Sequence, residues 1–420
     1  MITLGVVAGC GDADEDPGIA DTSTSAGDAS TSIDDSSAST SSEDASASTS
    51  TDDASTSTST DDASTSTDDA STSSEDASAS ADSDVEDTSA DAPADGEVCG
   101  DACPPAMLRG INIAGAEFGA AELPGTHLTD YIWPTLANGY DVSYYTDKGM
   151  NVIRLPFLWE RLQPTLRGPF DVTENARLTA AVAEFEATGA TVVLDPHNYA
   201  RYRGAILNES DVTSADLADL WARLATLFAD DPQVVFGLMN EPREMDTGSW
   251  VEAANAALVA IRDAGADNLV LVPGNHWTGA WSWDAAWIAE DQRNSVRMLD
   301  IVDPGDHLAF EVHQYLDNDY SGTLPGCQSA TVGSQAMATL TAWLRTHGRR
   351  AFVGELGAGS DDTCLAALAD LVGHIEANAD VYIGWAYWAG GPWWGTYFTS
   401  LEPTDAVDKP QMDVLEAFLP

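Results

Sequence analysis

Eight short apolar runs recur along the chain after residue 106, and this rhythm constrains the fold more than any other feature. The runs are rich in β-branched and aromatic residues, which is typical of strands that are buried on both faces. They span Leu108–Ile113, Asn151–Phe157, Thr191–Pro196, Val234–Asn240, Leu269–Pro273, Leu308–Val312, Ala351–Glu355 and Tyr382–Ala386.

Helical stretches separate many of these runs. We expect helices at Ala176–Thr188, Ser214–Phe228, Trp250–Ala264, Gln335–Thr346 and Leu365–Asn378. Alternation of strand and helix over eight units predicts an α/β fold, the (β/α)8 or TIM barrel. An open, doubly wound sheet is the alternative. It is less favoured because residues 110–115, after the first run, lack the glycine spacing of a dinucleotide-binding loop.

The first 98 residues differ sharply from the rest of the chain. They consist mostly of Ser, Thr, Ala and Asp, and they contain 25 acidic residues and no Lys or Arg, in a protein of formal net charge −52. Such a segment buries too little apolar surface to offset its ordering entropy. We therefore predict a disordered, extended linker over residues 11–98 and a folded domain over 99–420. The acidic balance argues against nucleic acid as a partner but tolerates neutral glycans.

Residues 1–10 form a short apolar run that ends in small residues and Cys10. This pattern is typical of the lipobox of bacterial lipoproteins, in which the cysteine is lipidated and becomes the mature N-terminus. We expect an exported protein, either tethered to a bacterial cell surface or outer membrane through Cys10 or secreted. A chance apolar terminus is the alternative. Because no other run of 18 apolar residues exists, no membrane span is expected.

Two of the predicted strands end in glutamates. Glu241 follows the run that starts at Val234, and Glu355 ends the run that starts at Ala351. The carboxyl ends of all strands in a (β/α)8 barrel lie at one face, where active sites are found. Two carboxylates that face one cleft are the chemistry of glycoside hydrolysis, in which one group donates a proton and the other attacks or stabilises the sugar.

Further polar and aromatic side chains occur at the same strand ends. They are Arg154, His197, Asn198, Asn240, His313, Tyr315, Trp385 and Trp388. Each of them alone has an ordinary structural explanation, such as an ion pair or core packing. Their accumulation at one end of the predicted strands favours a functional site.

Seven segments carry recognisable motifs, at residues 109–115, 152–156, 195–202, 237–242, 312–323, 354–357 and 382–388. Among them, Asn-Glu-Pro at 240–242 is moderately specific. The runs His-Asn-Tyr-Ala-Arg from His197 and Tyr-Leu-Asp-x-Asp-x-Ser-Gly-Thr from Tyr315 are more so. Together they resemble family 5 glycoside hydrolases, in particular the fungal-type endoglucanase branch, over residues 107–417. Pro196 and Tyr202 depart from the residues usual in that family.

The resemblance implies roles for the charged residues. Glu241 would be the general acid/base and Glu355 the nucleophile. Arg154 and Tyr315 would keep Glu355 ionised, and Asn240 would bind the sugar 2-hydroxyl.

The remaining implied contacts are to sugar. His197 and His313 would hold sugar hydroxyls or tune the two acids, and Trp388 would be the platform at the cleavage point. Trp277 is a further candidate platform, because aromatic rings bind the apolar faces of sugars. Other tryptophans could line the cleft or pack in the core: Trp159, Trp281, Trp283, Trp393 and Trp394.

The predicted function is a retaining endo-β-1,4-glucanase that hydrolyses internal bonds of β-glucan by double displacement and acts as a monomer. A β-mannanase or another β-glucanase on the same scaffold is the alternative, since a fold does not fix the substrate. A non-catalytic glycan-binding surface protein is a remote third. No cofactor is expected, and no His spacing suggests a metal.

The chain contains five cysteines. If Cys10 is lipidated, an even set of four remains, which in an exported chain suggests two disulfides. The expected pairs are Cys99–Cys103 and Cys327–Cys364, and the family resemblance supports the second; four free thiols are the alternative. The spacings fit no zinc-ligand pattern.

Overall fold

A computed structural model describes residues 107–420. The predicted linker at 11–98, the lipobox at Cys10 and the pair Cys99–Cys103 lie outside the described residues, so they stay predictions.

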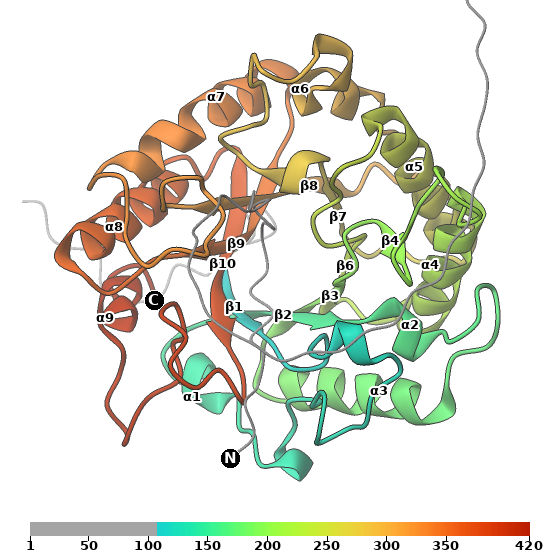
Figure 1. Ribbon diagram of the computed structural model, residues 1–420, viewed down its shortest axis with the longest axis horizontal. Coiled ribbons are helices and arrows are strands. Elements are labelled where there is room, and N and C mark those ends of the chain that lie inside the picture. Colours follow the sequence, from blue (N-terminus) through green and yellow to red (C-terminus); the bar gives the residue numbers. More distant parts are fainter. Residues whose placement is uncertain (1–106) are drawn as a thin grey trace, which may run out of the picture. The chain divides into compact units, whose positions relative to one another are not determined.

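Eight parallel strands close into a barrel at the centre of the domain (Figure 1). In barrel order, neighbours are β1, β10, β9, β8, β7, β6, β3 and β2. The strands span Leu108–Ile113 (β1), Val152–Phe157 (β2), Thr191–Pro196 (β3), Val234–Gly237 (β6), Val270–Pro273 (β7), Leu308–Tyr315 (β8), Ala351–Gly357 (β9) and Tyr382–Gly390 (β10). The predicted barrel is confirmed, and the open sheet is excluded.

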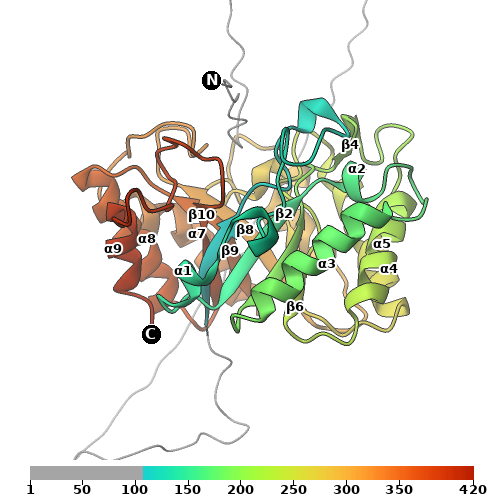
Figure 2. The ribbon, with the colours of Figure 1, turned by 90° about the horizontal axis from the view of Figure 1, so that it is seen from below.

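Helices form a ring around the barrel, as the two ribbon views show (Figures 1 and 2). The long ones are Val172–Glu186 (α3), Ser214–Phe228 (α4), Thr247–Asp263 (α5), Val332–His347 (α7) and Asp362–Ala377 (α8). All five predicted helices are confirmed within a few residues. Several begin at a capping carboxylate, because the first backbone N–H groups of a helix need acceptors. Asp171, Asp246 and Asp361 supply this cap.

Shorter elements connect or extend these units. They are the helices Ser143–Thr146 (α1), Trp159–Leu162 (α2), Asn294–Arg297 (α6) and Pro410–Glu416 (α9), the strands Arg201–Tyr202 (β4) and Ala205–Ile206 (β5), and the 3-10 helices Ala120–Glu122 (η1), Leu136–Asn138 (η2), His276–Thr278 (η3), Glu290–Gln292 (η4) and Met298–Asp300 (η5). Within the described residues, no helix is long and apolar enough to cross a membrane.

The strand ends near the barrel mouth differ most from the prediction. β6 stops at Gly237 rather than at Asn240, although the backbone N–H groups of Leu238 and Asn240 still donate to Leu271 and Pro196, at 3.0 and 2.9 Å. β8 instead continues to Tyr315. Both differences lie at the carboxyl ends of strands, where the candidate site residues Asn240, His313 and Tyr315 are found.

The barrel interior is layered. A separate cluster of buried apolar side chains fills one end: Val152, Val193, Val235, Leu271, Ala309, Phe352 and Ala386. Side chains two positions further along a strand point to the same side. Arg154, Asp195 and Glu311 therefore form a charged layer directly above three of these residues, and all are at most 1% exposed. The apolar layer closes the barrel beneath the site.

Candidate active site

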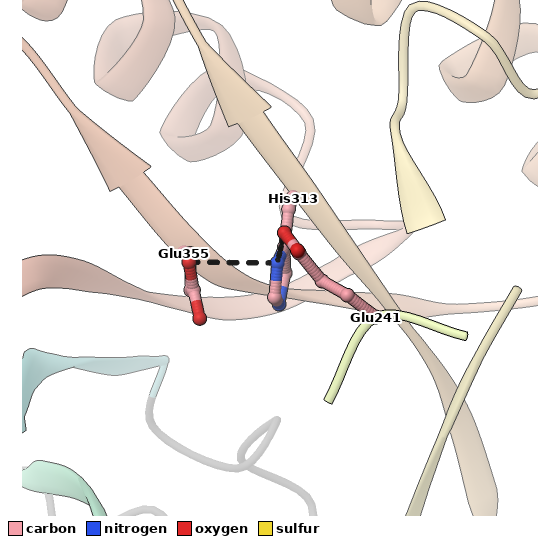
Figure 3. Close-up of side chains that lie close together, drawn as sticks. All are labelled: Glu241, His313 and Glu355. Atoms are coloured by element: carbon pink, nitrogen blue, oxygen red, sulfur yellow. Dashed lines mark hydrogen bonds and ion pairs between the residues drawn. The ribbon is translucent and has the colours of Figure 1, made fainter. Parts of the chain in front are cut away.

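Glu241 and Glu355 face each other at the barrel mouth, with His313 between them (Figure 3). One carboxylate oxygen of each glutamate and one ring nitrogen of His313 lie within 4.8 Å of one another. All three side chains are buried. The two strand-end carboxylates that the sequence predicted as a pair are therefore brought together.

The backbone at Glu241 is unusual. Its φ is +39°, in the left-handed region that costs energy for a residue with a side chain. Pro242 follows directly. At this turn the chain leaves the direction of β6, and the Glu241 carboxylate points toward His313. The Nδ1 of His313 lies 2.8 Å from Glu241 Oε1.

Arg154 organises the floor of the site from β2. Its guanidinium, fully buried, makes ion pairs with Asp195, Glu311 and Glu355 at 3.0, 2.9 and 3.1 Å. It also donates to the side-chain oxygens of Asn112 and Asn240, at 2.9 and 2.8 Å. A buried cation with this many acceptors holds its neighbours in fixed positions.

Glu355 is held in its ionised form. Burial favours the neutral acid, but the positive charges of His313, Arg154 and His197 outweigh burial and lower the pKa of the Glu355 carboxyl. The hydroxyl of Tyr315 acts in the same direction by donating to Oε2 at 2.7 Å. This carboxylate is suited to act as an anion at neutral pH.

His313 lies among three carboxylates. Burial disfavours its charged form, but Glu355, Glu241 and Glu311 raise the pKa of its imidazole to about 10. Its Nε2 lies 3.3 Å from Glu311 Oε1. Gly354 leaves room for that carboxylate, because a Cβ there would lie 2.4 Å from Glu311 Oε1.

His197 links Asp195 to Asn240. Its Nδ1 lies 2.8 Å from Asp195 Oδ2, and its Nε2 lies 3.1 Å from the amide nitrogen of Asn240. Burial lowers the pKa of His197, but Asp195 and Glu355 reverse this and raise it. The ring stacks on Trp388, with 5.4 Å between centroids and 21° between planes.

A hollow opens on one side of this group. Glu241 lines it, together with Trp277, Trp281, His313, Tyr315 and Tyr320, whereas Glu355, Arg154 and Trp388 do not. Aromatic rings around a carboxylate suit a neutral ligand with apolar faces, such as a sugar.

Comparison with known proteins gives the same family as the sequence motifs. Residues 111–391 match the model of the cellulase family, glycosyl hydrolase family 5. The chain belongs to glycosyl hydrolase family 5. It is a glycoside hydrolase with the (β/α)8 barrel of that family.

Several relatives of this family 5 enzyme are closely similar. Endo-beta-1,4-glucanase A of Emericella nidulans is 41% identical over 300 residues, which is 71% of this chain and 87% of the relative. The crystal structure of the endo-beta-1,4-glucanase Xac0029 from Xanthomonas axonopodis pv. citri is 43% identical, with a TM-score of 0.71, over 74% of this chain and 98% of that one. XacCel5A, solved in complex with cellopentaose, is 43% identical, with a TM-score of 0.72, over 74% and 99%.

Not every predicted residue of the family 5 site lies beside the glutamates. Asn198 instead accepts from the backbone of Trp159 and donates to Glu160, so it fixes the loop after β2. Trp159 and Trp283 are fully buried and belong to the core rather than to the hollow. Tyr202 is buried too, and its hydroxyl donates to the carbonyl of Gln163.

Trp277 reaches the hollow through a strained turn. His276, Trp277 and Thr278 all have positive φ, at 56°, 56° and 49°. Three successive non-glycine residues in this region are costly and persist only where the surroundings fix them. The backbone N–H of Trp277 donates to the carbonyl of Pro242, which ties this turn to the residue after Glu241.

Three site residues were not singled out from the sequence: Asn112, Asp195 and Glu311. Alternation along the strands would have indicated two of them, because Asp195 precedes His197 by two positions, and Glu311 precedes His313 by two. Asn112 donates to the carbonyl of Gly354 at 2.8 Å, next to Glu355. In the sequence, nothing distinguished Asn112 from the other residues of the first predicted strand.

Glu241, His313 and Glu355 are the group in the described part of the chain whose ligand atoms could reach one metal ion. The raised pKa of His313, about 10, makes its imidazole protonated at neutral pH. A protonated imidazole has no lone pair to offer a metal. In the absence of a metal, these carboxylates favour the protonated form of His313.

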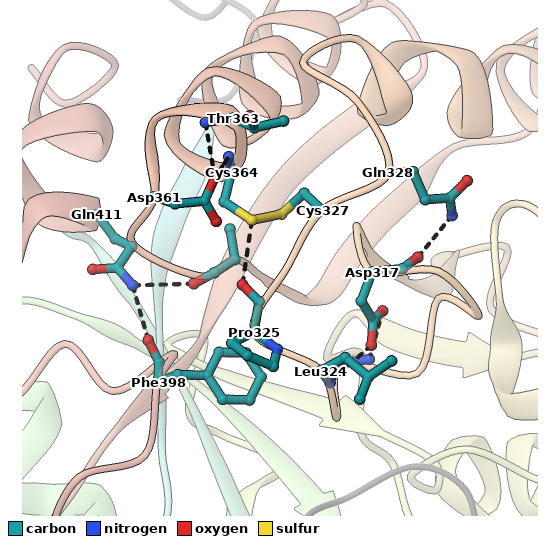
Figure 4. Close-up of a disulfide and its surroundings, with 12 residues drawn as sticks. Asp317, Leu324, Pro325, Cys327, Gln328, Asp361, Thr363, Cys364, Phe398 and Gln411 are labelled. Carbon is teal, nitrogen blue, oxygen red and sulfur yellow. Dashed lines mark hydrogen bonds between the residues drawn. A yellow bond between two sulfur atoms is a disulfide. The ribbon is translucent and has the colours of Figure 1, made fainter.

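A disulfide joins Cys327, after β8, to Cys364 in α8, with 5.1 Å between the Cα atoms (Figure 4). It is the second pair expected from the sequence. The loop after β8 is also held by Asp317, whose carboxylate accepts from the backbone N–H groups of Gly322, Thr323 and Leu324. The loop that lines the hollow is thus fixed at both ends.

Proposed function

We propose that this protein is a retaining endo-β-1,4-glucanase in which Glu355 is the nucleophile and Glu241 the general acid/base. The observation that carries the proposal is the short distance between them: one carboxylate oxygen of Glu241 lies within 4.8 Å of one carboxylate oxygen of Glu355. Retaining glycosidases hold their carboxyl groups roughly 5–5.5 Å apart, whereas inverting enzymes need roughly 6.5–9.5 Å to admit a water.

In the first step, Glu355 attacks the anomeric carbon of the bound glucosyl unit. The bond to the leaving oxygen breaks, and that oxygen takes a proton from Glu241. In the second step, the Glu241 carboxylate removes a proton from water, which attacks the anomeric carbon and releases Glu355. The same side chain therefore acts first as acid and then as base.

The surrounding charges support this division of labour. Arg154 and the Tyr315 hydroxyl bind both oxygens of Glu355, at 3.1 and 2.7 Å, and keep it anionic. His313 Nδ1 lies 2.8 Å from Glu241 and 3.6 Å from Glu355. Protonation of either carboxylate therefore changes the electrostatic stabilisation of the His313 imidazolium. Asn240, fixed by Arg154, is placed to bind the 2-hydroxyl, a contact that strengthens in the transition state.

The roles of Glu241 and Glu355 also define which side of the cleft binds the leaving group. A general acid protonates the leaving group, so the hollow beside Glu241 receives the leaving-group sugars. The side with Trp388, stacked on His197, receives the sugar that becomes attached to Glu355. A chain lying across both sides is cut internally.

The substrate class rests on two supports. Relatives at about 40% identity are named endo-beta-1,4-glucanases, and XacCel5A binds cellopentaose. The hollow beside Glu241 is rimmed by aromatic rings, and no Lys or Arg lines it to bind an acidic polymer. Both favour a neutral β-1,4-linked glucan.

The experiment that tests this is reducing-end release on carboxymethylcellulose, mixed-linkage glucan, glucomannan and laminarin, each with wild type and Glu355→Gln. We expect turnover of the β-1,4-containing glucans by wild type and none by the variant. Stronger turnover of mannan-rich substrate would instead support a mannanase. Activity that survives in Glu355→Gln would refute the nucleophile.

We further propose that the enzyme is an exported monomer in which residues 11–98 connect the barrel to an anchor at Cys10. The acidic composition of this segment, without aromatic or basic residues, supports a linker rather than a glycan-binding module. Deletion of residues 11–98 should leave turnover of soluble glucan within about twofold of wild type. Expression with a complete export signal should release the Cys10→Ala variant in soluble form, whereas equal solubility of wild type would refute the anchor.

A further inference from the structure

An aromatic cluster continues outward from the hollow beside Glu241. Trp281 stacks on Tyr320, with 4.8 Å between ring centroids and 21° between planes. Trp287 also packs against Trp281, with 5.8 Å between ring centroids and 30° between planes, and it makes an edge contact with His276 at 6.2 Å. We call Trp281, Tyr320 and Trp287 the outer aromatic cluster.

Exposure rises along this cluster. Trp281 and Tyr320 line the hollow, and Trp281 is 36% exposed; Trp287, one ring further out, is 63% exposed. Most of the other tryptophans are buried, and Trp283, two residues after Trp281, is fully buried. Large exposed aromatic rings next to a binding hollow are typical of ligand contact rather than of core packing.

The cluster is held in place from beneath. The backbone N–H of Trp281 donates to the side-chain oxygen of Gln314 at 3.0 Å, and Gln314 is buried in β8 between His313 and Tyr315. The backbone N–H of Ala280 donates to the carbonyl of His313 at 3.0 Å. The Trp281 segment is thus attached directly to β8, the strand that carries His313.

Tyr320 is fixed from a different loop. Its backbone N–H donates to the carbonyl of Asp317 at 3.2 Å, and the Asp317 carboxylate orders the residues that follow. The loop after β7 and the loop after β8 therefore meet through the Trp281–Tyr320 stack. Rigid aromatic rings lose little entropy when they bind a ligand, which makes them efficient contact surfaces.

We propose that the outer aromatic cluster is a distal leaving-group subsite, in which Trp287 stacks on a sugar of the β-glucan chain beyond those held in the hollow. This inference rests on the proposed function, because Glu241 as the acid defines the leaving-group side. The ligand is the reducing-end portion of a neutral β-1,4-glucan. Trp287 thereby favours long chains over short oligosaccharides and sets which bond of an oligosaccharide is cut.

The test compares Trp287→Ala with Val302→Ala. Val302 is the matched control, because it is 65% exposed and lies in the loop that precedes β8, at the opposite end of the barrel. Each enzyme is given reducing-end-labelled cellohexaose and an aryl β-cellobioside, whose leaving group is too short to reach Trp287. The readouts are the ratio of kcat/KM on the two substrates and the frequency of cleavage at each bond.

For Trp287→Ala we expect the ratio of kcat/KM, cellohexaose over aryl cellobioside, to fall about three- to tenfold, the value of one aromatic contact. Cleavage should shift toward the reducing end, since fewer sugars are held on the leaving-group side. Val302→Ala should match wild type in both readouts. A merely structural role of Trp287 would lower both activities together and leave the cleavage pattern unchanged.

The outcomes separate the two proposals. If wild type cleaves both substrates and Trp287→Ala gives the same ratio and pattern, the distal subsite is refuted while the proposed function stands. If wild type cleaves neither substrate, the proposed function fails, and the subsite fails with it.

Discussion

The hydroxyl of Tyr315 donates a hydrogen bond of 2.7 Å to Oε2 of Glu355, from the last residue of β8 to the neighbouring strand β9. This bond favours the ionised carboxylate, so it contributes to the lowered pKa of Glu355. It also leaves Arg154 to hold the other oxygen, at 3.1 Å.

Tyr315→Phe should therefore raise the pKa of Glu355. Because a nucleophile must be ionised, the acidic limb of the kcat/KM profile should move to higher pH by about 1–2 pH units, the effect of one hydrogen bond to a charged group. The measurement is kcat/KM on a soluble glucan from pH 3 to 8. Tyr144→Phe is the control, because the Tyr144 hydroxyl donates to Asp408 rather than to Glu355. An unchanged acidic limb in Tyr315→Phe would show that the bond does not tune Glu355.

The two glutamates should fail in different ways. Glu355→Gln removes the nucleophile and should abolish turnover of every substrate. Glu241→Gln removes only the acid/base, so an aryl glycoside with a good leaving group should still form the covalent intermediate, which then accumulates. Added azide should rescue this variant and yield a β-glycosyl azide, since a small anion needs no base to attack. The products are identified by NMR.

An α-glycosyl azide would contradict the retaining mechanism. Identical loss of activity in both variants, without rescue, would contradict the assignment of roles.

Glu117, in the loop after β1, should make stability depend on pH. Burial raises the pKa of its carboxyl to about 7; Oε2 accepts from the backbone of Gly115 at 2.7 Å, and Oε1 has no hydrogen-bond partner. The folded pKa lies above the unfolded one, so the folded state binds more protons between them, and wild type loses stability as pH rises from about 5 through 7.

Glu117→Gln cannot ionise, so its stability relative to wild type should improve with pH, by about 2 kcal/mol between pH 5 and pH 8. Urea unfolding at both pH values measures this difference. Glu122→Gln is the control, because Glu122 is a more exposed carboxyl in the same loop. A constant difference between Glu117→Gln and wild type across the pH range would refute the raised pKa.

The disulfide Cys327–Cys364 should contribute to both stability and binding. It closes a loop of 37 residues, so its loss should cost about 3–4 kcal/mol in the loop-entropy model. The double variant Cys327→Ser, Cys364→Ser should melt at lower temperature and show a higher KM, because the tethered loop carries Tyr320 at the hollow. Calorimetry and initial rates test this. A melting temperature equal to wild type, with both thiols of wild type reactive, would contradict it.

The barrel could be predicted from sequence because its signal is local and repeated. The helix at Ser214–Phe228 was placed without error, and the strands at Leu108–Ile113 and Thr191–Pro196 likewise. Each of these segments shows its hydrophobic period within its own residues, between turn or capping residues. The pairing of Glu241 with Glu355 also followed, since all parallel strands of a barrel end at one face.

Other parts of the site depend on contacts between distant segments. Asn198 has the same kind of strand-end position as His197, yet its side chain accepts from the backbone N–H of Trp159 and donates to the carboxylate of Glu160. Trp283 and Trp287 both follow Trp281 in one aromatic loop, and only packing against Phe310 and Trp343 buries the first while leaving the second in solvent.

The sequence by itself determined the fold, the family and the two glutamates, since these rest on local periodicity and on motifs written in consecutive residues. Only the tertiary structure decided the carboxylate separation, the raised pKa of His313 and the outer aromatic cluster. Distances and pKa values depend on how side chains from separate strands converge in a desolvated space, and no single segment contains that information.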